Sequence, residues 1–138
     1  MKISTRGRYG LRLLVDLAEN HQDHPIALSQ VAERQGVSEK YLQQVALMLT
    51  RNGVLVSVKG AGGGYLLKDN PSEILVYDVL DILEGGLSFD DPSFGTQTAI
   101  RRCLHSYFYQ KLDLRIQQLF EGMTLADIVQ QETFSYSI

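Results

Sequence analysis

The chain has 138 residues, about the size of one globular domain, and 44% of them are hydrophobic, which argues against a disordered chain. Its net charge of −3 combines 13 basic with 16 acidic side chains, and no apolar run approaches the ~20 residues of a membrane span. The charge is uneven, because residues 1–68 carry +4 and residues 69–138 carry −7. We therefore expect two roles on one chain.

The single cysteine, Cys103, excludes an intramolecular disulfide framework and a zinc site of the paired-cysteine type. A lone cysteine is typical of a reducing compartment, so we expect a cytoplasmic protein with no membrane partner. Cys103 itself has two interpretations. It is either a packing residue of a helix or a redox-sensitive thiol activated by the preceding Arg101 and Arg102.

Helical periodicity and capping residues predict three helices in the first part of the chain. Ser4 or Thr5 is the expected N-cap of the first helix, and Ser38 that of the third. The three helices are expected at Thr5–Glu19, Leu28–Gln35 and Glu39–Asn52. Gly53 ends the third helix, at the C′ position where glycine is common.

A β-hairpin follows these helices. The β-branched run Val54–Val58 and the segment Tyr65–Leu67 predict two strands, joined by the glycine-rich turn Lys59–Gly64. Three helices followed by a hairpin is the order of a winged helix-turn-helix. The fold class is therefore mainly α with a small β-hairpin, and residues 1–68 form the predicted winged-helix domain.

The second half is predicted to be helical. A helix is expected over Glu73–Glu84 and ends at Gly85 and Gly86. A loop over Leu87–Gly95 leads into a long helix over about Thr96–Glu121, and Thr124 with Asp127 predicts a capped last short helix. One stripe of the long helix is apolar, comprising Ile100, Leu104, Phe108, Leu112, Ile116 and Leu119.

The most specific signal is a spacing of small and apolar residues around the second and third helices. Ala32 allows two helices to approach closely, and Gly36 permits the left-handed backbone of a tight turn. Leu42 and Val45 then face inward. The outward face carries Lys40, Gln43 and Gln44, whose side chains suit phosphates and base edges.

A plain helical corner with a solvated polar face would show the same spacing, but the neighbouring basic residues favour DNA. Lys59 lies at the tip of the hairpin, and Arg6 and Arg8 lie at the start of the first helix. The glycine run does not match a nucleotide-binding loop, because Tyr65 replaces the required glycine and a strand follows. No nucleophile–base pair is present either, so we do not expect an enzyme.

Three separated motifs resemble the Rrf2 family of bacterial transcription regulators over nearly the whole chain. They are Ser4–Gly10, Val37–Gln44 and Lys59–Tyr65. The resemblance implies a dimeric winged-helix DNA-binding regulator whose long helix, in the region 69–138, forms the dimer contact. It also implies DNA contacts at Thr5, Arg6, Arg8, Tyr9, Ser38, Lys40, Tyr41, Gln43, Gln44, Lys59 and Gly60.

Many members of that family hold an iron–sulfur cluster on three cysteines near the start of the long helix. Cys103 corresponds to the last of these, and the other two have no counterpart here, so we predict no cofactor. The chain is most similar to the cluster-free, CymR-like branch, which implies control of cysteine metabolism and a partner enzyme such as cysteine synthase. An iron–sulfur or thiol-based redox sensor, and a winged-helix protein-interaction module, stay open as alternatives.

Our leading hypothesis is a homodimeric repressor with double-stranded DNA as its partner. Each protomer would insert the helix Glu39–Asn52 into a major groove, and the two-fold axis predicts a near-palindromic site. Gln43 and Gln44 would read bases, with adenine as the natural partner of an amide.

Overall fold

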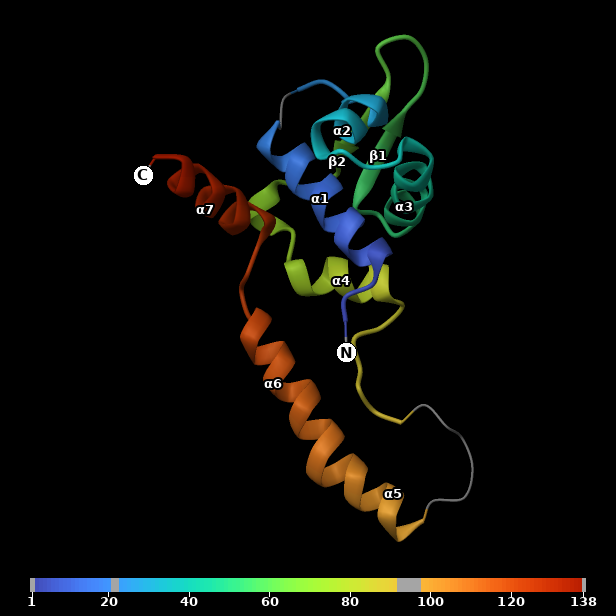
Figure 1. The fold of residues 1–138 in the computed structure, drawn as a ribbon, viewed down its shortest axis with the longest axis vertical. Coiled ribbons are helices and arrows are strands. Elements are labelled where there is room, and N and C mark those ends of the chain that lie inside the picture. Colours follow the sequence, from blue (N-terminus) through green and yellow to red (C-terminus); the bar gives the residue numbers. More distant parts are fainter. Residues whose placement is uncertain (1, 21–22, 92–97, 138) are drawn as a thin grey trace.

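The structure is a computed structural model that describes residues 2–20, 23–91 and 98–137. Two parts are visible in Figure 1: a body that contains the first three helices and the hairpin, and a long helix that projects from it. None of the helices in the described segments is long and apolar enough to span a membrane.

The three N-terminal helices confirm the helix-turn-helix prediction. They are α1 (Thr5–Glu19), α2 (Leu28–Gln35) and α3 (Glu39–Arg51), and α3 is one residue shorter than predicted. Ser4 caps α1 by accepting a hydrogen bond from the amide of Gly7, and Ser38 caps α3 in the same way from Tyr41. Gly36 adopts a φ of 64° between α2 and α3, which explains why the turn requires glycine.

The hairpin consists of β1 (Leu55–Val58) and β2 (Gly64–Leu67), paired antiparallel with Leu55 opposite Leu67 and Val58 opposite Gly64. On its other side, β2 pairs with the segment before α2, because Tyr65 and Ile26 exchange backbone hydrogen bonds of 3.0 and 2.9 Å. A side chain at position 64 would place its Cβ 2.2 Å from the Ile26 carbonyl oxygen. Near the turn, β2 thus lies between β1 and the segment before α2.

One hydrophobic core joins the winged helix to the second half of the chain. Leu13, Leu42 and Leu49 are fully buried in it, and so are Leu83 of α4 and Leu125 of α7. The winged helix therefore packs against helices that follow residue 68 in the sequence.

The helix predicted over Glu73–Glu84 is divided in the structure. A short 3₁₀ helix, η1 (Pro71–Glu73), precedes α4 (Val76–Glu84), and Ile74 and Leu75 between them are extended. Leu75 forms a bridge with Thr124, and the Leu125 amide donates to the Ile74 carbonyl at 3.0 Å. This pairing with a distant segment explains why the prediction was wrong at the start of this helix.

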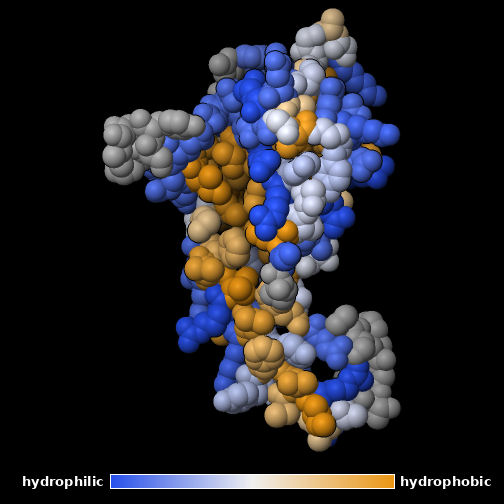
Figure 2. All heavy atoms as spheres, in the orientation of Figure 1, coloured by the Kyte–Doolittle hydropathy of each residue, from blue (hydrophilic) through white to orange (hydrophobic). Residues whose placement is uncertain are grey.

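The long helix is confirmed, with corrections to its start and its regularity. Thr98 is an extended N-cap, so α5 (Ala99–Cys103) begins three residues later than predicted; residues 92–97 lie outside the described residues. The π-helical segment η2 (Leu104–Tyr109) follows, and α6 (Gln110–Phe120) completes the helix. Figure 2 shows apolar residues along this projecting helix, where Ile100 is 73% and Leu119 is 70% exposed.

The last helix, α7 (Leu125–Ser137), returns to the body and packs against α1. Its predicted cap is confirmed, because the Thr124 amide donates to Asp127 at 2.9 Å and the Asp127 amide donates to Thr124 Oγ1 at 3.2 Å. At 13 residues it is longer than the short helix expected from the sequence.

Candidate nucleic-acid interface

The outward face of α3 is polar and cationic, as its sequence predicts. Helix α3 buries Leu42, Val45 and Leu49 in the core and leaves its opposite side uncovered. The exposed residues on that side are Lys40, Gln43, Gln44, Leu47 and Arg51. A rigid helix with amides and cations on its free face fits the major groove of DNA.

Three predicted contact residues surround the start of α3. Tyr9 of α1 and Tyr41 of α3 are half-buried and meet edge to face, with ring centroids 5.1 Å apart. Ser38 uses its hydroxyl oxygen as the cap of α3, which leaves its hydroxyl proton available as a donor. The contact between Tyr9 and Tyr41 therefore positions α1 against α3.

The N-terminal residues of α1 divide into exposed and structural ones. Thr5 and Arg8 are exposed, and Arg8 Nε donates to the Ile3 carbonyl at 3.1 Å. Arg6 is half-buried and donates from Nε to the carbonyl of Leu83, near the end of α4. Arg6 therefore ties α1 to α4, a role that the sequence did not indicate.

The tip of the hairpin exposes Lys59 and Gly60 to solvent. The turn is closed by a hydrogen bond of 3.0 Å from the Gly63 amide to the Gly60 carbonyl. A thin basic turn of this kind can approach a phosphate or a groove wall closely.

A buried carboxylate joins α1 to α2, a contact that the sequence pattern did not predict. Asp16 of α1 is only 2% exposed and accepts hydrogen bonds from Arg34 Nε (3.0 Å), Arg34 Nη2 (2.7 Å) and Gln35 Nε2 (2.8 Å) of α2. The hydrogen bond with Asp16 is the main cause that raises the pKa of the Arg34 guanidinium. In the sequence, Asp16 interrupts the apolar stretch Leu13–Ala18, and this interruption could have indicated a buried charge.

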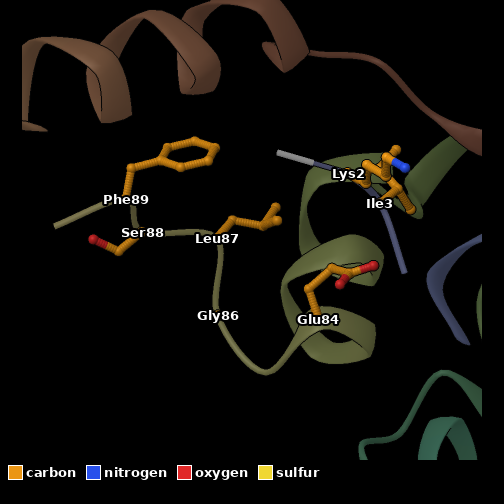
Figure 3. A pocket seen from close by; sticks show the side chains of 7 residues that line it. All are labelled: Lys2, Ile3, Glu84, Gly86, Leu87, Ser88 and Phe89. Carbon is orange, nitrogen blue, oxygen red and sulfur yellow. The ribbon is translucent and has the colours of Figure 1, made fainter. Parts of the chain in front are cut away.

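A second unforeseen cluster joins the N-terminal segment to α4. The backbone amide and the hydroxyl of Ser4 both donate to Glu84 Oε1, at 3.0 and 2.9 Å. Beside this contact lies a cleft of about 340 Å³, seen in Figure 3, with Ile3, Leu87 and Phe89 among its apolar lining residues.

Cys103 lies near two contacts between charged side chains. Cys103 is exposed at the end of α5, so it does not pack in the core of the protomer. His105 Nδ1 contacts Asp90 Oδ2, and Arg101 lies 3.7 Å from Asp91. Within the described segments no three His, Cys, Asp or Glu residues are grouped to hold a metal ion.

Comparisons with known proteins find transcriptional regulators. The Rrf2 family model, described as an iron-dependent transcriptional regulator, matches residues 3–131. The chain is 34% identical to the HTH-type transcriptional regulator IscR of Yersinia pseudotuberculosis, over 96% of this chain and 81% of that protein.

Two solved structures resemble this one closely. CymR, the global cysteine regulator of B. subtilis, has a TM-score of 0.78 at 30% identity, covering 95% of this chain and 98% of that one. The oxidized form of Staphylococcus aureus CymR has a TM-score of 0.71 at 32% identity, covering 94% and 96%. These relatives are transcriptional regulators and not enzymes.

Proposed function

Because this chain belongs to the Rrf2 family of DNA-binding transcription regulators, we propose that it is a homodimeric repressor of a near-palindromic operator. The observation that carries the proposal is the polar and cationic face of α3, which is exposed. The opposite side of α3 is buried and anchors the helix in the core. Two such faces related by a two-fold axis would read two half-sites one helical turn apart.

In this proposal each protomer contacts DNA through three segments. Gln43 and Gln44 read base edges in the major groove, with adenine preferred, while Lys40 binds phosphate. Thr5, Arg8 and Lys59 bind phosphates on either side, together with Ser38 and the backbone of Gly60. Arg6, Tyr9 and Tyr41 mainly position these segments, because each already contacts another element.

Dimerisation is assigned to the second half of the chain. Four residues of the apolar stripe, Ile100, Leu104, Phe108 and Leu119, are exposed on a helix that projects from the body, and a second copy of the helix would cover them. We accordingly assign DNA contact to residues 1–68 and dimerisation and regulation to residues 69–138. The +4 charge of the first region and the −7 charge of the second agree with this division.

Control of cysteine metabolism is supported by the likeness to CymR of B. subtilis, which is named as a cysteine regulator. A partner enzyme such as cysteine synthase would act on the second region. Mapping the genomic binding sites tests this assignment, since the neighbouring genes identify the pathway. Sites outside genes of sulfur metabolism would contradict it.

The DNA-binding geometry is tested with the DNA upstream of the chain's own gene. Fluorescence anisotropy at several salt concentrations gives the affinity and its salt dependence. Lys59→Ala should weaken binding. It should also lower the slope of log K against log salt concentration by about 1.8, for a dimer that loses two phosphate contacts. Lys68→Ala, at the base of the hairpin, is the control and should leave the slope unchanged. Absence of salt-dependent binding would instead favour a protein-interaction module.

A second candidate, an iron-dependent sensor, is favoured by the description of the family model. The residues of this chain do not fit a cysteine-ligated cluster, because one thiol per protomer cannot supply the usual four ligands. Protein purified anaerobically should therefore be colourless and free of bound iron. Visible absorbance with stoichiometric iron would reverse this conclusion. The exposed Cys103 thiol stays a candidate for redox sensing without a metal.

A further inference from the structure

Leu47 is an apolar side chain in the middle of the polar face of α3. Its side chain is 47% exposed, although Leu42 and Leu49 on the same helix are fully buried. At 100° per residue, the exposed Lys40, Gln43, Gln44 and Arg51 all lie within about 60° of one direction, and Leu47 points close to their mean. It therefore lies among Lys40, Gln43 and Gln44, the residues of α3 that are assigned to DNA.

The surroundings of Leu47 indicate what covers it in a complex. Lys40 and Arg51 place a positive charge on the N-terminal and C-terminal sides of Leu47, and the two glutamines lie three and four residues before it. A surface of this charge attracts a polyanion. The major groove of DNA offers an apolar group beside its polar edges, the 5-methyl of thymine.

We propose that Leu47 contacts a thymine methyl group, so that Leu47 and the preceding glutamines read adjacent A·T pairs. The inference rests on the proposed DNA-binding function and assigns a specificity-determining residue within it. Residues three or four apart on one helix face have Cβ atoms about 5–6 Å apart, and stacked bases are about 3.4 Å apart. An amide–adenine contact and a leucine–methyl contact thus fall on the same or a neighbouring base pair.

The test uses a duplex selected from a random pool by the full chain. Each thymine is replaced in turn by deoxyuridine, which removes only the methyl group. For the wild-type chain, each half-site should contain one thymine whose replacement on its own weakens binding by about fourfold, as expected for a buried methyl. For Leu47→Ala the same replacement should have no effect, because the apolar partner is absent.

Two further variants complete the experiment. Leu47→Met keeps an apolar side chain and should keep its response to deoxyuridine. Leu75→Ala makes the same truncation at another exposed leucine, between η1 and α4, and should behave as wild type.

The inference is overturned if no deoxyuridine replacement weakens wild-type binding, or if wild type and Leu47→Ala respond equally. It is also overturned if the selected half-sites contain no thymine. Failure to select any duplex is a different result, because it contradicts the proposed function itself.

Discussion

Asp16 shows how a single buried charge positions two helices. Its carboxylate is enclosed by donors from Arg34 and Gln35, which fixes α2 against α1 and so orients the turn into α3. Arg34→Ala would leave this buried carboxylate without its cationic partner. We expect a loss of about 2–3 kcal/mol in the free energy of unfolding by urea, below the fully buried case because Arg34 is partly exposed.

The matched control for Arg34 is Arg51→Ala, on the exposed face of α3, which should change the free energy of unfolding by less than about 0.5 kcal/mol. Adding Asp16→Asn to the Arg34→Ala variant removes the unpaired charge and should recover part of the loss. If the double variant is no more stable than Arg34→Ala, charge burial is not the cause.

The predicted site residues differ in how well sequence alone placed them. Lys40, Gln43 and Gln44 follow from helical periodicity, because a buried opposite face determines which side of α3 is free. Arg6 could not be placed in this way, since its partner, the Leu83 carbonyl, lies 77 residues away in the chain. Contacts of that separation depend on tertiary packing.

Helices α1 and α7 bring two carboxyl groups together. Burial, then the hydrogen bond and the charge of Glu132, raise the pKa of Glu19 above its ordinary value of 4.5; Asp16 adds to the effect and Arg34 opposes it. Arg12 and Gln35 face the same groove between the helices. The folded chain therefore binds the proton of Glu19 more tightly than the unfolded chain does.

This pair makes stability fall as the pH rises. The contribution of Glu19 is fully present below pH 4.5 and is lost as the pH rises through its folded pKa. Glu132→Gln removes one of the two charges and should raise the free energy of unfolding by urea at pH 7, by at most about 1 kcal/mol because Glu19 is exposed. The gain should shrink towards pH 4. Asp69→Asn, an exposed carboxylate elsewhere, should produce no such trend.

At the level of elements, local signals predicted the N-terminal helices and the hairpin well. Caps and glycines at Ser4, Ser38 and Gly36 determine those boundaries, and all three are encoded locally. The extended Ile74 and Leu75 depend instead on pairing with Thr124, which no local pattern reveals. The π-helical turns of η2 were also missed, because the apolar stripe predicts a helix without fixing its hydrogen-bonding pattern.

The molecule as a whole has a large apolar surface on its projecting helix. Phe108 lies near the centre of the exposed stripe, and a charge there would be buried between two protomers. We expect Phe108→Glu to be monomeric in analytical ultracentrifugation, with an unchanged helix content. It should bind a palindromic duplex at least tenfold more weakly than wild type, because each protomer then binds alone.

Gln110→Glu introduces the same charge at an exposed polar position two residues away and is the control for Phe108→Glu. It should leave the mass and the DNA affinity of the dimer unchanged. A dimeric Phe108→Glu variant would exclude this stripe as the contact between copies.

The hairpin has a further consequence for engineering this protein. Because Tyr65 is paired with Ser57 on one side and with Ile26 on the other, the strands have no freedom to slip when the turn changes. Side chains in the turn can therefore be changed while the strands stay in register, provided that Gly60 and Gly62, with φ of 95° and 75°, are kept. A fluorophore attached through a cysteine introduced at the exposed Ala61 would report groove contact directly, once Cys103 is replaced to leave a single labelling site.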